Sequence, residues 1–321
     1  MKGVFLESPG VIKIKDIDDT DDIPEGFIKI RVKSVGICGS DVHYYLHGRI
    51  GDFVLEKPMI LGHETAGITE SNGNNIRKGD IVAIEPGLPC EKCKYCKTGR
   101  YNLCPDIKFF ATPPVDGSLR EYIIYPEEFV YRAGGLTTNE AGLSEPMSVG
   151  VYATGKAGIG PENNVLIVGS GSVGILTAFS AEAHGSNVTL CDINMDKIKY
   201  ARKCGFAAFL NDEIHDKYDT VFECSGMATE FAQNKTGKGG DLFLIGMGNT
   251  SGLNPLYISS NEITVHGIFR YSNTFNDAIK IIKKYRNRLK PFLEKNIGID
   301  NLDSYLKNKE YEKYLKTIVE L

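Results

Sequence analysis

In the N-terminal part of the chain, apolar and polar residues alternate as in half-buried β-strands. From residue 28 to residue 33, isoleucine and valine alternate with lysine and arginine, so one face of this strand is expected to be buried. Further short strands are predicted around Thr65–Thr69, Ile81–Ile84 and Tyr122–Tyr125, with turns rich in glycine, proline and asparagine between them. The pattern predicts a small, irregular, barrel-like β-rich domain.

The pattern changes after the Ala-Gly-Gly sequence at residues 133–135. Thr137 and Glu140 have the spacing of a capping box, in which each side chain satisfies a backbone N–H group of the other residue. The apolar positions that follow predict one helix through Leu143, Met147 and Tyr152, which would link two domains.

Beyond this helix, predicted strands and helices alternate. Strands are expected at Val165–Val168, Val188–Cys191, Thr220–Cys224 and Leu242–Ile245, and helices at Val173–His184 and Asp196–Cys204, closed by Gly185 and Gly205. This alternation predicts an α/β fold with a doubly wound parallel sheet. From Asn276 an amphipathic helix follows, and a last short strand is expected at Thr317–Val319. We expect this tail to pack back on the first domain.

Length, charge and cysteine spacing argue against several classes of protein: nucleic-acid-binding, membrane-spanning and secreted disulfide-rich proteins. The 321 residues are sufficient for two domains, and the net charge of -4 argues against a nucleic acid or an anionic membrane as partner. No apolar stretch approaches the roughly 20 residues that span a bilayer. Four cysteines are scattered outside the one dense cluster, which argues against a secreted disulfide framework. We therefore expect a cytoplasmic protein.

That dense cluster is Cys90, Cys93, Cys96 and Cys104, in a glycine- and proline-containing loop at about residues 86–106. Four thiolates can complete the tetrahedral shell of a structural Zn²⁺ ion, with no position left for water. Two disulfides are an alternative, disfavoured because no signal peptide precedes the chain and intracellular thiols stay reduced. A nucleic-acid-binding zinc ribbon would require a basic domain.

A dinucleotide site is predicted where the first strand of the α/β region meets its helix. Gly169, Gly171 and Gly174 form the pattern G-x-G-x-x-G directly after the strand, and the helix begins near Val173. The glycines allow the tight turn, the approach of pyrophosphate and close helix packing, and the helix N-terminus supplies N–H groups. The alternative is that they serve only the turn.

Asp192 indicates which dinucleotide would bind. It ends the second strand at the distance expected for a carboxylate that accepts hydrogen bonds from the adenosine ribose. The carboxylate would repel a 2′-phosphate, and the next residue, Ile193, offers no cation in its place. NAD is therefore favoured over NADP.

A second group of metal ligands is predicted in the first domain. Cys38 follows the alternating strand, His63 and Glu64 are adjacent, and Glu145 lies at the domain junction. One thiolate, one imidazole and one or two carboxylates leave room for water or substrate, as in catalytic zinc sites. The spacing leaves open that Cys38 is an ordinary buried thiol and His63 a hydrogen-bonded turn residue.

Several sequence blocks, taken together, resemble the sorbitol/xylitol dehydrogenase branch of the zinc-dependent medium-chain dehydrogenases. They are CGSDVHY at residues 38–44, GRIGDFV at 48–54, KPMILGHE at 57–64, ATPPVDG at 111–117, EPMSVG at 145–150 and GIFRY at 267–271. The resemblance covers essentially the whole chain. It implies a GroES-like catalytic domain at 1–148 and 273–321 and a Rossmann domain at 149–272.

The resemblance also implies roles for individual residues. Cys38, His63 and Glu64 would bind the catalytic zinc, with water in the open position, and Glu145 would hold that water or bind zinc itself. Ser40 and His43 match proton-relay positions. The residues expected to line the substrate pocket are Tyr44, Ile50, Phe53, Phe109, Thr112, Arg270 and Tyr271. Core packing is the alternative role for the aromatic residues among them.

The activity implied is the NAD-dependent oxidation of a secondary alcohol of a small polyol to a ketose, with the active site between the domains. Two zinc ions per subunit and a homotetramer or homodimer are expected. Another zinc-dependent sugar or threonine dehydrogenase is one alternative. A catalytically silent NAD-binding protein is another, although such a protein would be expected to lose the zinc ligands that this chain retains.

Overall fold

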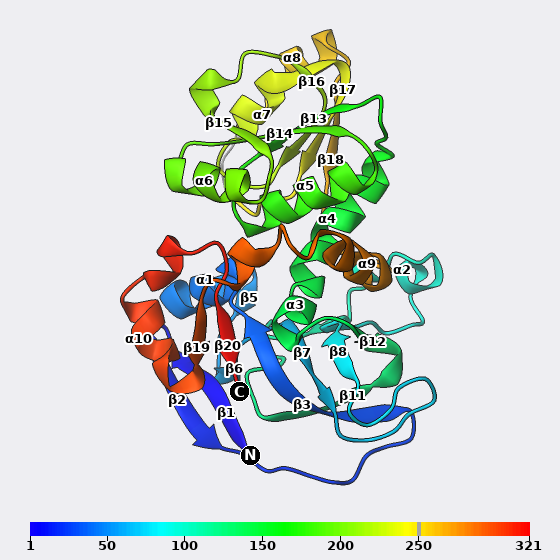
Figure 1. The fold of residues 1–321 in the computed structure, drawn as a ribbon, viewed down its shortest axis with the longest axis vertical. Helices are drawn as coiled ribbons and strands as arrows, with labels where there is room; N and C mark the ends of the chain where they lie inside the picture. The colour runs from blue at the N-terminus through cyan, green and yellow to red at the C-terminus, as the bar shows by residue number, and fades with distance from the viewer. Residues whose placement is uncertain (249–251) are drawn as a thin grey trace. The chain divides into compact units, whose positions relative to one another are not determined.

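Both ends of the chain belong to the same structural unit (Figure 1). In the computed structural model, which describes residues 1–248 and 252–321, unit 1 comprises Met1–Glu145 and Phe292–Leu321, and unit 2 comprises Pro146–Pro291. The first boundary lies close to the predicted residue 148. The second differs, because the family resemblance assigns residues 273–291 to the first domain, whereas they pack in unit 2.

The reason for this difference is an aromatic contact inside unit 2. Helix α9 (Phe275–Tyr285) packs against α5 (Ser172–Ala183), and the ring of Tyr285 lies 5.1 Å from that of Phe179. Arg288 then donates a hydrogen bond of 2.8 Å to Glu182 on α5. Only the residues from Phe292 onward return to unit 1.

Unit 1 is built on one seven-stranded sheet. Its strands follow the order β12 (Val130–Arg132), β8 (Ile81–Ile84), β7 (Glu64–Thr69), β3 (Phe27–Gly36), β20 (Ile318–Glu320) and β19 (Asn296–Gly298), and β11 (Tyr122–Pro126) also pairs with β3. The predicted strands at residues 28–33, 65–69, 81–84 and 122–125 are confirmed. Because β3 has neighbours on both sides, even Lys29 is buried, where its ammonium contacts Asp21 at 2.7 Å.

Smaller elements complete unit 1. The further strands are β1 (Lys2–Ser8), β2 (Val11–Asp16) and β6 (Met59–Ile60) in a three-stranded sheet, and the pairs β4 (Arg49–Ile50) with β5 (Phe53–Val54) and β9 (Gly87–Leu88) with β10 (Lys108–Phe109). The α-helices are α1 (Gly39–His47), α2 (Lys94–Lys97), α3 (Thr138–Gly142) and α10 (Leu302–Lys307). Short 3₁₀ helices lie at Tyr101–Leu103, Glu127–Phe129, Ile299–Asn301 and Glu310–Lys313, with another at Lys290–Leu293 where the chain returns to this unit.

The linking helix is interrupted. The capping box is confirmed, since the Glu140 N–H donates to Thr137 Oγ1 at 3.2 Å and the Thr137 N–H donates to the Glu140 carboxylate at 2.7 Å. However, α3 ends at Gly142 and a second helix, α4 (Ser144–Ala157), begins after Leu143. The prediction of one continuous helix is wrong because Pro146 has no N–H group to donate to the Gly142 carbonyl.

Unit 2 contains a six-stranded parallel sheet. Its strands follow the order β15 (Ala207–Leu210), β14 (Asn187–Asp192), β13 (Asn164–Val168), β16 (Tyr218–Glu223), β17 (Thr236–Leu244) and β18 (Thr264–Gly267). In chain order this is 3-2-1-4-5-6, the doubly wound arrangement of a Rossmann fold. The predicted fold class is confirmed, although the short strands β15 and β18 were not predicted.

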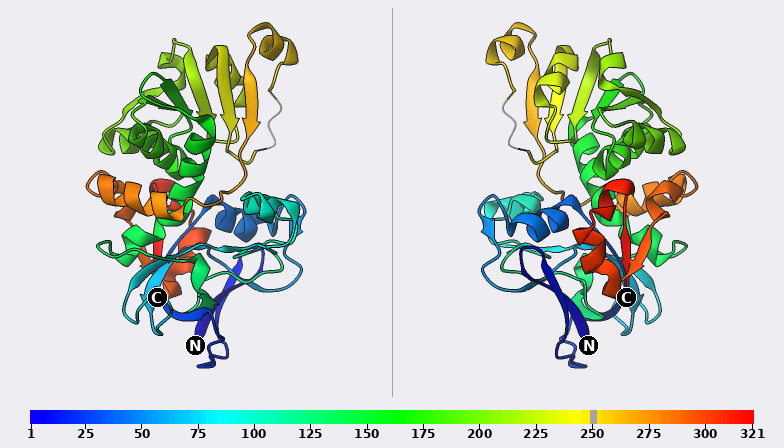
Figure 2. Two further views of the ribbon diagram at one scale, coloured as in Figure 1. Left: turned by 90° about the vertical axis from the view of Figure 1, so that its right-hand side faces the viewer. Right: turned by 90° about the vertical axis from the view of Figure 1, so that its left-hand side faces the viewer.

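Helices pack along this sheet (Figure 2). α5 packs against β13 and β14, and α6 (Met195–Lys203) against β14 and β15, whereas α7 (Thr229–Lys235) packs against β16 and β17. The remaining helix, α8 (Pro255–Ser260), lies between β17 and β18 in the chain, and a 3₁₀ turn spans Asn211–Glu213. Among the helices of the described residues, none is both long and apolar enough to cross a membrane.

Candidate active site and metal centres

Three candidate zinc ligands meet where β3 and β7 come together. Cys38 is the residue before α1, just after β3, and His63 and Glu64 lie at the start of β7. One ligand atom from each residue lies within 4.8 Å of the others. The pairing of Gly36 with Glu64 explains this proximity, because it places the end of one strand beside the beginning of the other.

Asp41 supports this group and was not predicted from the sequence. Its carboxylate accepts hydrogen bonds from the Cys38 N–H at 2.9 Å and the Gly62 N–H at 3.1 Å, and lies 3.8 Å from Nδ1 of His63. Burial opposes protonation of the imidazole, but the surrounding acidic groups, Asp41 first among them, raise the pKa of His63 to about 10. Acceptors of this kind orient metal-binding side chains. A capping aspartate three residues after Cys38 was the available sequence signal.

Glu64 supplies the clearest sign that this group fits a metal ion. The residue is 1% exposed, and its Oε1 accepts a hydrogen bond from Lys316 at 2.6 Å, whereas Oε2 is buried and accepts none from any residue that the structure describes. A buried carboxylate oxygen without a partner is unfavourable unless something else satisfies it. One thiol, one imidazole and one carboxylate are the donors of a three-ligand zinc site with an open fourth position.

Glu145 lies near this group but outside the set of three. It is buried in the first turn of α4, and its charge helps to raise the pKa of His63 and that of Lys316. The ligand atoms that lie within 4.8 Å of one another come from Cys38, His63 and Glu64. The structure therefore groups three ligand atoms and leaves Glu145 outside that group.

The predicted relay and pocket residues of unit 1 have different surroundings. Phe109 is buried with its ring 6.0 Å from that of His63, so it lies beside the candidate ligands. Ser40 and His43 are on α1, where His43 is exposed and its ring lies 4.7 Å from that of His47. Thr112 is partly buried and forms an isolated β-bridge with Val115.

Other predicted pocket residues take part in packing. Tyr44 belongs to the hydrophobic core of unit 1, and Ile50 packs against that core. Phe53 pairs with Ile50 between β4 and β5 and is 43% exposed. Tyr44 therefore contributes to core packing, the alternative role named for the aromatic residues.

Arg270 and Tyr271 lie in unit 2, after β18. Arg270 adopts a left-handed backbone conformation with a φ angle of 51°, and its guanidinium lies 5.0 Å from the ring centre of Phe269. Tyr271 is buried, with its ring 5.7 Å from that of Phe275. A non-glycine residue with positive φ is uncommon, and such conformations cluster at functional sites.

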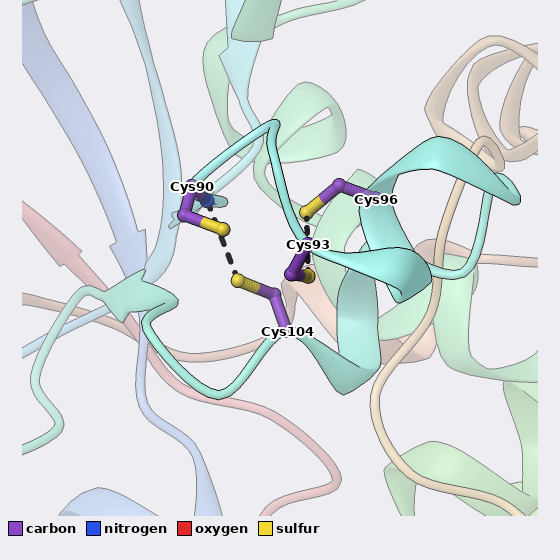
Figure 3. A group of neighbouring side chains, drawn as sticks. All are labelled: Cys90, Cys93, Cys96 and Cys104. Carbon is purple, nitrogen blue, oxygen red and sulfur yellow. Dashed lines mark hydrogen bonds between the residues drawn. The ribbon is translucent and has the colours of Figure 1, made fainter.

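The four clustered cysteines surround one point (Figure 3). Their sulfur atoms lie within 4.8 Å of one another, and those of Cys93 and Cys96 are 3.4 Å apart. Sulfurs about 2.3 Å from a tetrahedral zinc ion stand roughly 3.8 Å apart, so the arrangement fits zinc. None of the eight cysteines forms a disulfide, which favours zinc over the disulfide alternative. The backbone N–H of Cys96 lowers the pKa of the Cys93 thiol to about 7.

A buried carboxylate anchors this cysteine loop to the main sheet. Glu85, just after β8, accepts hydrogen bonds from the hydroxyls of Tyr101 at 2.7 Å and Tyr131 at 2.8 Å. Burial raises the pKa of Glu85 in spite of these hydrogen bonds. Tyr101 lies inside the loop, between Cys96 and Cys104, so its hydroxyl ties the loop to the sheet. No periodic or motif signal pointed to Glu85.

The glycine loop of unit 2 has the geometry that the sequence predicted. Gly169 has a φ angle of 97°, and a Cβ atom on Gly174 would overlap the carbonyl oxygen of Gly169. By contrast, a Cβ atom on Gly171 would meet nothing within 4 Å. Gly171 thus leaves its surroundings open to a ligand, and Gly174 permits α5 to pack on the loop, as in dinucleotide-binding folds.

Asp192 holds the same loop in place. Its carboxylate accepts hydrogen bonds from the Ser170 N–H at 2.7 Å and the Asn194 N–H at 2.9 Å. Each oxygen keeps a further lone pair, so the group can still accept from a ribose hydroxyl. The neighbouring Ile193 is 83% exposed. The carboxylate therefore has a structural role in addition to the predicted one.

A cavity of about 310 Å³ lies at the carboxyl ends of β16 and β17. Its lining residues include Glu223, Gly226, Thr229, Leu244, Gly246 and Leu253. Glu223 is buried, and its carboxylate accepts hydrogen bonds from the backbone N–H groups of Ser225 and Gly226. Ligands of open α/β sheets bind at the carboxyl ends of the strands.

The two parts of the chain match two domain families. Residues 24–135 match the alcohol dehydrogenase GroES-like domain, and residues 172–284 match the zinc-binding dehydrogenase domain. The chain is 38% identical to sorbitol dehydrogenase of Bacillus subtilis over 303 residues, which are 88% of this chain and 86% of that protein. The chain belongs to the zinc-dependent sorbitol dehydrogenase family. It is an oxidoreductase of the medium-chain type, and the resemblance seen in its sequence blocks is confirmed.

Other relatives of this dehydrogenase extend the comparison. It is 36% identical to sorbitol dehydrogenase of Bos taurus, with 90% of this chain and 87% of that protein covered. It is 33% identical to D-xylulose reductase of Morganella morganii, with 95% and 96% covered. An Escherichia coli dehydrogenase of unknown specificity superimposes with a TM-score of 0.91 at 29% identity, covering 99% of this chain and 98% of that one. The matched family is that of the zinc-binding dehydrogenases, and the chain retains candidate zinc ligands.

Proposed function

We propose that this dehydrogenase oxidises a secondary hydroxyl group of a small polyol, such as sorbitol or xylitol, to the corresponding ketose with NAD. The observation that carries the proposal is the group Cys38, His63 and Glu64, with an unpartnered carboxylate oxygen, in a chain that also has a dinucleotide loop. The named activities of its relatives, sorbitol dehydrogenase and D-xylulose reductase, support the polyol as substrate.

Cys38, His63 and Glu64 would hold the catalytic zinc ion, and Cys90, Cys93, Cys96 and Cys104 the structural one. A zinc ion with an open position is a Lewis acid that lowers the pKa of a bound hydroxyl group. The residues around it transfer the proton of the reacting hydroxyl. Glu145 holds a water molecule beside this hydroxyl and accepts the proton that the hydroxyl loses, and Ser40 with the exposed His43 passes a proton towards solvent.

The remaining roles concern orientation. Arg270 donates hydrogen bonds to a hydroxyl group next to the reacting carbon, and Tyr271 with Thr112 supplies further polar contacts, while Phe109 keeps water away from the ligands. Tyr44, Ile50 and Phe53 shape the pocket, two of them from or against the core. The nicotinamide supplies the hydride acceptor. Gly169, Gly171, Gly174 and the start of α5 at Val173 hold the pyrophosphate, and Asp192 the ribose.

The test is NADH formation from a panel of polyols, L-threonine and 2-propanol at a fixed zinc concentration. We expect the polyols to give the highest kcat/KM. Cys38→Ser should lose activity and one of two zinc ions per chain, whereas Glu145→Gln should keep its zinc and turn over more slowly. Cys204→Ser is the matched control, because Cys204 is a buried thiol outside both ligand groups.

Three outcomes would reject parts of this proposal. Faster NADH formation from threonine than from every polyol would make the protein a threonine dehydrogenase. Full activity of Cys38→Ser would remove this group as the catalytic centre. Absence of turnover with every substrate, in protein that holds two zinc ions and NAD, would favour the catalytically silent alternative.

We further propose that the protein is a cytoplasmic homotetramer or homodimer. None of the eight cysteines forms a disulfide, which suits a reducing compartment. β18 is the last strand of its sheet, so its outer edge can accept a second copy of the chain, and Met227, Met247 and Leu256 in the same unit are exposed apolar side chains. Analytical ultracentrifugation tests this, and a monomer at micromolar concentration would reject it.

A further inference from the structure

A lysine near the end of the chain is buried beside the candidate zinc ligands. Lys316 donates hydrogen bonds to Oε1 of Glu64 at 2.6 Å and to the carbonyl oxygen of Ile37 at 3.2 Å. The side chains of Lys316 and Glu64 are 4% and 1% exposed. A fully buried ion pair contributes little to stability compared with an apolar pair of the same size. Its presence at this position therefore points to a role in the site.

Strand pairing fixes where the ammonium group lies. Gly36 at the end of β3 pairs with Glu64 of β7 on one side and with Ile318 of β20 on the other. The Ile37 N–H also donates to the Thr317 carbonyl at 2.9 Å, which holds the residue next to Lys316 against the same stretch of chain. Backbone hydrogen bonds between β20 and β3, and between Ile37 and Thr317, therefore fix the position of Lys316 next to Glu64.

The two oxygen atoms of Glu64 have different environments. Lys316 occupies Oε1, whereas Oε2 is buried without a hydrogen-bond partner. Space for Oε2 exists because residue 36 is glycine, since a Cβ atom at that position would collide with it. Lys316 therefore holds Oε1, and Oε2 lies in the space that a side chain at position 36 would otherwise fill.

We propose that Lys316 is a positioning residue of the zinc site, which holds Oε1 of Glu64 and thereby leaves Oε2 as the atom that binds the metal. The inference rests on the zinc site of the proposed function and adds a residue to it. Lys316 acts through Glu64. Its ammonium group donates hydrogen bonds to the Glu64 carboxylate and the Ile37 carbonyl oxygen.

Lys316 affects metal affinity in two opposite ways. Its hydrogen bond orients Glu64 and favours metal binding, whereas its positive charge opposes the binding of a cation. Lys316 forms an ion pair of 2.6 Å with the Glu64 carboxylate, and the acidic groups around it, Glu64, Cys38 and Glu145, favour its charged form. A cation repels Zn²⁺, and its removal would tighten metal binding if charge alone mattered. Removal of an orienting partner instead weakens binding, typically 10- to 100-fold. The sign of the measured change therefore separates the two effects.

The test uses Lys316→Met, which keeps an unbranched side chain, shorter by the ammonium nitrogen, and removes its charge and donors. The affinity for the catalytic zinc ion, which is the ion that Cys38→Ser should lack, is measured by competition with a chelator. In a second measurement, Co²⁺ replaces zinc and its visible spectrum reports the coordination. We expect about 10- to 100-fold weaker binding and an altered cobalt spectrum. Lys307→Met, which removes an exposed lysine of the same C-terminal segment, should match the unmodified protein in both measurements.

A second comparison works even if Lys316→Met alone does not fold. Glu64→Gln with Lys316→Met leaves no unpaired buried charge, and it should bind zinc as Glu64→Gln alone does, because Lys316 acts only through the carboxylate. Unchanged or tighter zinc binding by Lys316→Met, or a further loss in the double variant, would overturn the role of Lys316. If Cys38→Ser still holds two zinc ions, the zinc site itself is misplaced, whatever Lys316 does.

Discussion

The hydroxyl of Tyr101 donates a hydrogen bond of 2.7 Å to the buried carboxylate of Glu85 and so joins the cysteine loop to the main sheet of unit 1. Tyr101→Phe removes this donor and leaves a buried carboxylate oxygen unsatisfied. We expect a loss of about 1–3 kcal/mol in the free energy of unfolding, measured with urea. Tyr95→Phe, in the same loop, is the control. Equal stability of the two variants would contradict the anchoring role.

Gly174 and Gly171 should respond differently to the same change. Gly174→Ala forces a Cβ atom onto the Gly169 carbonyl and should lower the melting temperature of the protein. Gly171→Ala meets nothing within 4 Å and has a φ angle of -77°, so its stability should change by less than about 0.5 kcal/mol.

The functional readout of this pair is a titration with NADH followed by fluorescence. Gly171→Ala should bind NADH more weakly although it is stably folded, because its methyl group occupies space that the pyrophosphate requires. If Gly171→Ala binds NADH like the unmodified protein, the cofactor does not approach this loop as proposed.

Asp192→Ala with Ile193→Arg should shift the cofactor preference towards NADP. The change removes a carboxylate that repels a 2′-phosphate and adds a cation at an exposed position. Because Asp192 also accepts hydrogen bonds from Ser170 and Asn194, we expect weaker binding of NAD and a lower melting temperature at the same time. Initial rates with both cofactors provide the measurement. A preference of the unmodified protein for NADP would show that Asp192 has another role.

Cys93→Ser should remove the structural zinc ion. A closed four-thiolate site cannot replace a ligand, and metal binding there is coupled to folding of the loop. We expect one zinc ion per chain instead of two by atomic emission, together with lower thermal stability. Cys204→Ser, with its thiol outside both groups, should keep two. Two zinc ions in purified Cys93→Ser would contradict the assignment.

The sequence predicted those parts of the site whose residues lie close together in the chain. The glycine loop, the four cysteines and the pair His63–Glu64 are short motifs with a fixed geometry, and the structure brings each group together. Lys316 and Glu85 could not be predicted in this way. Lys316 meets Glu64 across 252 residues, and Glu85 meets Tyr131 across 46, without any periodic pattern.

The fold shows the same division between local and distant signals. Apolar runs predicted four of the six strands of the α/β region, but not β15 and β18. The break at Leu143 followed from the missing N–H group of Pro146, which the apolar spacing did not reveal. Residues 273–291 have the amphipathic pattern of a surface helix. That pattern does not specify which surface the helix covers, and the contact of Tyr285 with Phe179 decides it.

The pairing of β20 with β3 has a consequence for how the protein is made. Unit 2 is a continuous stretch of chain, so it can fold during synthesis, whereas unit 1 needs Phe292–Leu321 to complete its sheet. The ribosome therefore adds Lys316 after every acidic group that surrounds it. Until residues 316–320 emerge, the nascent chain holds Glu64 without its cation, and the pairing of β20 with β3 is what brings Lys316 to that carboxylate.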